Sequence, residues 1–165
     1  MARVSSNKIK PFENLVKILA QARKKGKKIV LCHGVFDLLH PGHIKHFETA
    51  KKKGDVLVVT ITKDEYVNKG PGRPVFSEFL RAESVAAIEC VDFVAINDWP
   101  AAVETIKKLK QTLPGLYVMM LTNNEVDERE YEEIIRAGVD DYFLKPVSFN
   151  RILLHLEKGL KRAAC

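Results

Sequence analysis

Two kinds of hydrophobic pattern alternate along the chain. Between residues 12 and 22, apolar side chains recur every three or four positions, which predicts an amphipathic helix that ends at Gly26. Further on, apolar and β-branched residues form short, nearly continuous runs, which are typical of strands buried on both faces. These runs are residues 27–34, 55–62, 92–97, 114–122 and 140–146. One helix is therefore predicted to precede five strands.

A helical pattern follows each predicted strand. The expected helix starts, in order, are Pro41, Ser77, Asp98 or Trp99 with Pro100, Asp127, and Ser148, and the expected stops include Gly54, Lys110 and Gly138. The expected core positions are Ile44, Phe47, Ala50, Leu80, Val85, Ile88, Tyr131, Ile134, Ile135, Ile152, Leu153, Leu156 and Leu160. This alternation predicts an α/β protein, a three-layer, doubly wound five-stranded parallel sheet of Rossmann-like or flavodoxin-like type with an extra N-terminal helix.

Length and composition fit a single domain over residues 1–165. At 46% hydrophobic residues the chain can bury a sizeable core, and it is too short for two ordinary domains. No apolar run approaches the roughly 20 residues that cross a bilayer, and the basic start lacks the apolar core of a signal peptide. Cys32, Cys90 and Cys165 are too widely spaced to indicate a disulfide framework or a zinc site. We therefore expect a cytoplasmic protein with no membrane partner.

The net charge of +6 is concentrated at the start of the chain. Residues 1–28 contain nine Lys or Arg against the single Glu13. Phe12 is the only aromatic residue in that segment, and a nucleic-acid site usually interleaves several aromatic side chains with the basic ones. The charge therefore favours a solvated basic arm over a specific nucleic-acid site.

The stretch GVFDLLHPGH, residues 34–43, carries the candidate chemistry. It follows the first predicted strand directly, at the edge where doubly wound sheets bind their ligands. A helix that begins at Pro41 directs backbone N–H groups and the positive end of its dipole toward that edge, which suits a phosphate. His40 and His43 lie three residues apart around Gly42, so both imidazoles can reach one anionic group and stabilise charge on a phosphoryl group in transit.

This stretch resembles the signature of the cytidylyltransferase-like nucleotidyltransferases, especially the sugar-phosphate branch of ADP-heptose synthase and glycerol-3-phosphate cytidylyltransferase. The resemblance covers residues 27–110 and includes KKGDVLVV, NKGPGRPV and RAESVAAIECVDFV. It implies that Gly34, Phe36 and Asp37 shape the turn after the first strand, with Gly42 beside them in the nucleotide site. It also implies that His40 and His43 stabilise the phosphoryl group under attack.

The same resemblance implies a reaction without a covalent enzyme intermediate. A substrate phosphate or hydroxyl would attack the α-phosphate of CTP or ATP, and Mg²⁺ would help to neutralise the leaving pyrophosphate. Lys69 and Arg73 lie in the loop that supplies basic phosphate contacts in such enzymes. Apart from the resemblance, these two side chains are ordinary members of a solvated loop. No protein metal site is predicted.

The second half of the chain departs from that family. Where the family has a base-binding loop and a Ser/Thr-rich segment, this chain has LTNNEVDERE and LKPVSFNR. Residues 113–162 instead resemble the last two βα units of a response-regulator receiver domain, in which Thr122 matches the switch residue and Lys145-Pro146 the phosphoryl-binding Lys-Pro. The acids of a working receiver are missing, because Asn97 stands at the acceptor position.

The simplest interpretation is an engineered chimera of a nucleotidyltransferase half, residues 1–112, and a receiver half, residues 113–165. A nucleotidyltransferase half that keeps strands 3-2-1 predicts the order 3-2-1-4-5, whereas a receiver has 2-1-3-4-5. The expected function is that of a chimeric scaffold with residual nucleotide or phosphate binding and no efficient catalysis. The alternatives are a cytidylyl- or adenylyltransferase acting on a sugar or polyol phosphate and, second, a receiver-like signalling module. The expected partners are small anions or nucleotide phosphates, and the expected state is a monomer or weak homodimer.

Two places in this fold suit a single bound anion. One is the helix start at residues 41–43, and the other is a pocket near Thr122 and Lys145. The first combines a helix dipole with two imidazoles, whereas the second combines one lysine with one hydroxyl. We expect the anion at the first.

Overall fold

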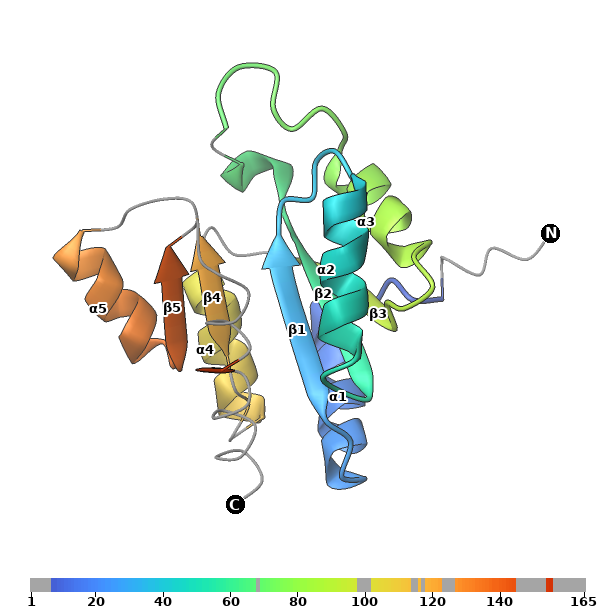
Figure 1. Cartoon of the computed structure of the whole chain (residues 1–165), viewed down its shortest axis with the longest axis vertical. Helices are drawn as coiled ribbons and strands as arrows, with labels where there is room; N and C mark the ends of the chain where they lie inside the picture. Colours follow the sequence, from blue (N-terminus) through green and yellow to red (C-terminus); the bar gives the residue numbers. More distant parts are fainter. Residues whose placement is uncertain are drawn as a thin grey trace. The chain divides into compact units, whose positions relative to one another are not determined.

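The structure is a computed structural model of the whole chain, and it describes residues 7–67, 69–97, 102–113, 116, 118–122, 127–144 and 154–155. The described residues belong to two compact units, residues 1–102 and 103–165 (Figure 1). The prediction of one domain over residues 1–165 stays a prediction. The predicted helix start at residues 98–100, together with Lys145, Pro146 and the Ser148 cap, lies outside the described residues.

The first unit is built on a parallel sheet of three strands. These are β1 (Ile29–Gly34), β2 (Val56–Thr62) and β3 (Phe93–Asn97), and β2 lies between the other two. Cys32 pairs with Val59 across the first ladder, and Val59 pairs with Val94 across the second. This arrangement has the 3-2-1 order of the prediction and differs from the receiver order, which would place β1 in the middle. The position of β4 and β5 beside β1 stays a prediction.

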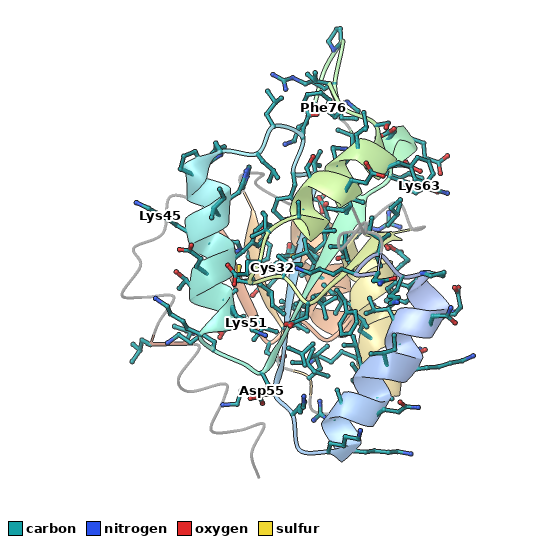
Figure 2. All side chains as sticks on the ribbon, turned by 90° about the vertical axis from the view of Figure 1, so that its right-hand side faces the viewer. Cys32, Lys45, Lys51, Asp55, Lys63 and Phe76 are labelled. Atoms are coloured by element: carbon teal, nitrogen blue, oxygen red, sulfur yellow. The ribbon has the colours of Figure 1, made fainter. Side chains whose placement is uncertain are left out.

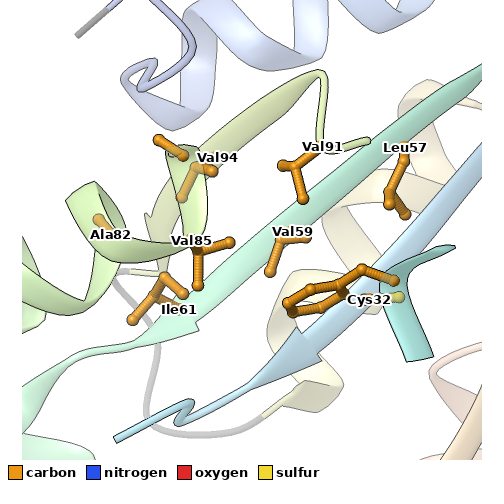
Figure 3. Packing of buried hydrophobic residues seen from close by; sticks show 10 residues of the cluster. Cys32, Leu57, Val59, Ile61, Ala82, Val85, Val91 and Val94 are labelled. Atoms are coloured by element: carbon orange, nitrogen blue, oxygen red, sulfur yellow. The ribbon is translucent and has the colours of Figure 1, made fainter. Parts of the chain in front are cut away.

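Helices cover both faces of this sheet. They are α1 (Phe12–Lys24), α2 (Pro41–Lys51) and α3 (Glu78–Ala86), and the short helix η1 (Asp64–Tyr66) follows β2. Figure 2 shows α1 and α2 on opposite sides of the sheet. Phe47 of α2 and Val85 of α3 pack with Val59 and Ile61 of β2 in one apolar cluster (Figure 3). Burial of this apolar surface is the main stabilising contribution to such a layer.

A short N-terminal segment protects the outer edge of β3. Ile9 forms a parallel bridge with Val94. The Lys10 N–H donates to the Val94 carbonyl at 2.8 Å, and the Val94 N–H donates to the Lys8 carbonyl at 2.9 Å. These bonds satisfy part of an edge that would otherwise be open to another chain.

Two of the predicted core residues are exposed. Ile44 of α2 is 40% exposed and Leu80 of α3 is 51% exposed, whereas Phe47 and Val85 are buried as predicted. The reason for the error at Leu80 is its neighbour Arg81, which is buried on the inner face of α3. Helical spacing alone admits either side chain to that face, and the hydrogen bonds of the arginine decide between them.

The second unit contains α4 (Ala102–Thr112), β4 (Met119–Thr122), α5 (Glu128–Arg136) and β5 (Asp141–Leu144). β4 and β5 are parallel and adjacent, with Leu121 paired to Phe143. Asp127 caps α5 as predicted, because its carboxylate accepts from the Glu130 N–H at 2.8 Å. Gly138 has a φ of 100°, the left-handed conformation that ends a helix.

Two further core predictions fail in this unit. Ile134 is buried, whereas Tyr131 and Ile135 on the predicted face of α5 are 44% and 41% exposed. No helix within the described part of the chain combines the length and the apolar character needed to cross a bilayer.

Candidate functional site

The motif residues lie at the carboxyl end of β1, at the start of α2. His40 is the N-cap of α2, and its Nδ1 accepts a hydrogen bond from the Gly42 N–H at 3.1 Å. Pro41 occupies the first helical position, where its fixed φ suits a helix and its missing N–H costs nothing. Because Nδ1 accepts, the ring proton of a neutral His40 is on Nε2, which can donate to a ligand.

The backbone donors expected at this helix start are already used. The Gly42 N–H donates to the His40 ring, and the His43 N–H donates to the His40 carbonyl at 2.8 Å. The expectation that these groups are free to hold a phosphate is therefore wrong for the structure as it stands. The cause is His40, whose ring accepts from the Gly42 N–H and whose carbonyl accepts from the His43 N–H.

Gly42 is required by the position of the His40 ring. A Cβ atom at residue 42 would lie 2.8 Å from Cε1 and 2.9 Å from Nδ1 of His40, closer than non-bonded atoms approach. Any side chain at this position would push the imidazole out of its place. Gly42 therefore allows the ring to lie over the first turn of α2.

The two motif histidines form a stacked pair. The ring centroids of His40 and His43 are 4.0 Å apart, with 33° between the ring planes. The ring of Phe36 meets His43 edge-on at 5.4 Å and contacts Phe47 at 5.1 Å. Phe36 has a φ of 49°, and a Cβ at Gly34 would lie 3.0 Å from its ring. The turn thus places the aromatic ring of Phe36 against His43.

Asp37 anchors a distant loop. Its side chain is 5% exposed and accepts from Arg73 Nη1 at 2.8 Å and from the N–H groups of Val75 and Phe76 at 2.7 and 3.1 Å. Burial acts to raise the pKa of Asp37, but the hydrogen bonds from Arg73 and the two N–H groups outweigh it and lower that pKa below its usual value. The carboxylate is therefore charged and fully engaged with the loop.

The loop between η1 and α3 carries the two predicted basic residues. Arg73 is 41% exposed and is joined to the motif turn through Asp37, and Arg73-Pro74 is a cis peptide bond. Lys69 is exposed near the tip, next to Gly70, which has a positive φ. The structure thus places Arg73 against the turn and Lys69 on the open part of the same loop.

Residues outside the predicted site hold these segments together. Arg81 is fully buried, and its guanidinium donates to acceptors in three separate segments. Asp64 and Glu78 bind each other's backbone: the Asp64 N–H donates to Glu78 Oε2 at 2.8 Å, and the Glu78 N–H donates to Asp64 Oδ2 at 3.1 Å. A sequence signal for Arg81 exists, since it lies four residues before Val85 and so shares the inner face of α3 with it. It was missed because the sequence analysis assigned that face to Leu80.

His33 is a second residue that sequence reasoning passed over. It lies at the end of β1, and its two ring nitrogens contact the hydroxyl oxygens of Thr60 at 2.8 Å and Thr62 at 3.4 Å. Burial lowers the pKa of His33 to about 4. The ring is thus neutral near pH 7, and it lies between the ends of β1 and β2.

The receiver-like residues are only partly described. The backbone of Thr122 ends β4, whereas Lys145 and Pro146 lie outside the described residues. Among the residues that the structure describes, no three His, Cys, Asp or Glu side chains come together as a metal site.

Comparisons with known proteins identify relatives of this chain. Residues 31–138 match the family described as cytidylyltransferase-like. The chain is 40% identical over 110 residues to the bifunctional protein HldE of Trichlorobacter lovleyi, and 50% identical over 105 residues to that of Campylobacter jejuni subsp. doylei. These matches cover 66% and 62% of this chain but 22% of each relative, so the chain spans about a fifth of the curated relatives' length.

A solved structure is similar over most of the chain. It is the crystal structure of the lipopolysaccharide core biosynthesis protein from Thermoplasma volcanium GSS1, which is 26% identical with a TM-score of 0.56. The similarity covers 74% of this chain and 99% of that one. The family match runs through residues 110–114, where a junction between two parents was predicted, and gives that junction no support. The chain belongs to the cytidylyltransferase-like family.

Proposed function

We propose that this chain is a nucleotidyltransferase that transfers a nucleotidyl group from CTP or ATP to the phosphate of a sugar phosphate and releases pyrophosphate. Membership of the cytidylyltransferase-like family supports this function over an inactive scaffold. The observation that carries it is the stacked pair of His40 and His43 at the start of α2. Two imidazoles at the carboxyl end of the first strand suit an α-phosphate under attack.

The chemical step exchanges one phosphorus–oxygen bond for another. An oxygen of the sugar phosphate attacks the α-phosphorus, and the bond from that phosphorus to the bridging oxygen breaks, so pyrophosphate leaves with the electron pair. Negative charge grows on the equatorial oxygens during this transfer. His40 Nε2, directed by the cap bond at Nδ1, donates to one of these oxygens, and His43 contributes a second imidazole beside it.

The loop residues act on the other side of the reacting bond. Lys69 contacts the leaving pyrophosphate, and Arg73 shares its guanidinium between Asp37 and the phosphates. Since Mg²⁺ commonly binds through one or two carboxylates and the substrate phosphates, the nucleotide itself would hold it here. When bound, the ion would neutralise charge on the pyrophosphate.

The name of one relative supports the choice of an acceptor class. One similar structure is that of a protein named for lipopolysaccharide core biosynthesis, which makes a sugar phosphate the first acceptor to test. Polyol phosphates are the second acceptor class. CTP and ATP both remain candidate donors.

A pyrophosphate-release assay tests the proposal. CTP and ATP are each combined with sugar phosphates and polyol phosphates, with and without Mg²⁺, and we expect turnover with at least one pair. His40→Ala should abolish most of that turnover, because one of the two imidazoles at the α-phosphate is lost. His46→Ala is the matched control, since His46 lies on the same helix and contacts Cys32.

Two outcomes count against the proposal. Turnover that survives in both His40→Ala and His43→Ala would show that the histidine pair is not the reacting site. Absence of release with every pair, together with intact pyrophosphate binding by calorimetry, would favour the scaffold with residual phosphate binding.

A further inference from the structure

A fully buried arginine connects the parts of the site that the reaction must hold together. The Arg81 guanidinium donates from Nε to the Phe76 carbonyl at 3.0 Å and from Nη1 to the Val35 carbonyl. Its Nη2 donates to the Thr62 carbonyl at 2.7 Å and to Asp64 Oδ1 at 2.6 Å. These four acceptors belong to the motif turn, the end of β2, the start of η1 and the loop before α3.

We propose that Arg81 is a positioning residue for nucleotidyl transfer, which fixes the turn bearing His40 against the loop bearing Lys69 and Arg73. This inference rests on the proposed function. Arg81 itself contacts no reacting atom in the proposed mechanism. It acts through Val35, which directly follows β1, and through Phe76, which closes the loop.

The acceptors of Arg81 require an arginine. Three of the four are backbone carbonyls, which no side-chain substitution elsewhere can remove or replace. A guanidinium presents five N–H donors in a rigid plane, so one side chain reaches acceptors on several segments at once. A lysine has three donors on one nitrogen and cannot span the same positions.

A second set of hydrogen bonds, those of Asp37, also joins the turn and the loop. Asp37 holds Arg73, Val75 and Phe76 from the side of the turn. Phe76 is therefore held twice, by its N–H through Asp37 and by its carbonyl through Arg81. Since Arg81 also binds the end of β2, it fixes both segments to the rigid sheet rather than only to each other.

This arrangement matters most in the transition state. The histidine pair contacts the α-phosphate, and the loop contacts the pyrophosphate that leaves it, so both must be in place when charge develops. A misplacement of about 1 Å costs roughly a hundredfold in rate. Loss of the Arg81 bonds should therefore lower kcat strongly and change the KM for the nucleotide little.

The test compares Arg81→Lys with a core control on the same helix, Val85→Ala. Val85 is buried in the apolar cluster and has no part in the site, so its truncation reports the effect of lost stability alone. Kinetics are measured at a temperature at which circular dichroism shows every variant folded. We expect kcat of Arg81→Lys to fall by about a hundredfold, whereas Val85→Ala keeps the wild-type kcat. Equal kcat values in the two variants would overturn the proposal.

A measurement without substrate separates this inference from the proposed function. His43 lies edge-on to Phe36, so the ring signals of His40 and His43 in nuclear magnetic resonance spectra report the geometry of the turn. Arg81→Lys should shift these signals and Val85→Ala should not, even if the wild-type chain shows no turnover. If Arg81→Lys fails to fold, Asp64→Asn removes the negative charge that pairs with Arg81 and leaves one acceptor oxygen for its two donors, Arg81 and the Glu78 N–H, and it should produce a smaller shift and a smaller loss of kcat. Unchanged ring signals in the folded variant would overturn the positioning role.

Discussion

The two ends of the three-stranded sheet carry ion pairs of opposite character. Figure 2 shows Phe76 near one end of the first unit, with Lys51 and Asp55 toward the other. At the carboxyl end, each ion pair has one buried member: Arg81 is 0% and Asp37 5% exposed, whereas their partners Asp64 and Arg73 are 39% and 41% exposed. At the amino end, Lys51 pairs with Asp92 at 2.5 Å, and the two side chains are 31% and 36% exposed.

This difference shows at which end of the sheet charged groups are removed from water. Removing a charge from water is unfavourable unless hydrogen bonds replace the lost hydration, and Arg81 and Asp37 need several bonds each to achieve it. The amino-end pair also has further hydrogen bonds, from Lys51 to the Asp55 carbonyl and from the Leu57 N–H to Asp92, but both of its side chains keep part of their hydration. The polar groups that are expensive to bury therefore lie at the end of the sheet where the histidine pair is located.

The largest expected effect comes from removing the buried guanidinium altogether. Arg81→Met keeps most of the side-chain volume but leaves three backbone carbonyls and Asp64 without their donor. A buried acceptor left without a donor costs about 1 to 3 kcal/mol, so three such carbonyls together cost about 3 kcal/mol or more. We expect that decrease in the free energy of unfolding, measured by urea titration with far-ultraviolet circular dichroism. A decrease below about 1 kcal/mol would place Arg81 with ordinary surface pairs and remove the contrast between the two ends.

The next largest expected effect is the pH dependence of the free energy of unfolding that His33 causes. Burial lowers its pKa from 6.5 to about 4, so between these values the unfolded chain binds a proton that the folded chain does not. The free energy of unfolding should therefore fall as the pH drops from 6.5 to 4, by up to about 3 kcal/mol from this group. Above pH 6.5 the ring is neutral in both the folded and the unfolded chain, so this group causes no loss of stability there.

The control for this prediction is His33→Asn, which cannot titrate. Other groups also bind protons in this range, so the informative quantity is the difference between the wild-type and variant slopes of unfolding free energy against pH. We expect the variant to have the smaller slope between pH 4 and 6.5. Parallel slopes would show that His33 is accessible to protons in the folded state.

The sequence predicted the alternation of helices and strands well, for a physical reason. Buried parallel strands are nearly continuous apolar runs, and the Asp127 cap and Gly138 stop act within a few residues of where they stand. The core faces were predicted less well. The exposure of Ile44 and Leu80 depends on contacts between segments far apart in the chain.

The sequence predicted the candidate site only in part, for the same reason. A local motif located His40, Gly42 and His43 at the start of one helix. Nothing local indicates that Asp37 binds Arg73, 36 residues later, or that Arg81 reaches back 46 residues to Val35. Nor does spacing show that His40 uses the very N–H groups expected for a phosphate. Contacts between distant segments decide these points, so only the fold reveals them.

The smallest expected effect lies at the amino end, and it completes the comparison. Lys51 Nζ bonds both Asp92 and the Asp55 carbonyl, yet the ion pair remains in contact with water. An ion pair of this kind contributes about 0.2 to 1 kcal/mol. Lys51→Gln removes the charge and keeps a polar side chain, so we expect a loss of unfolding free energy in that range.

Salt distinguishes this pair from the buried ones. Screening shortens the reach of exposed charges to about 3 Å at 1 M salt, whereas buried pairs are screened much less. In urea titrations repeated with 1 M sodium chloride, the difference between Lys51→Gln and the wild type should therefore shrink, and the difference for Arg81→Met should persist. A Lys51→Gln loss as large as that of Arg81→Met, and equally insensitive to salt, would mean that charge is held in the same way at both ends of the sheet. The buried charges around the histidine pair would then reflect the general construction of this fold rather than its site.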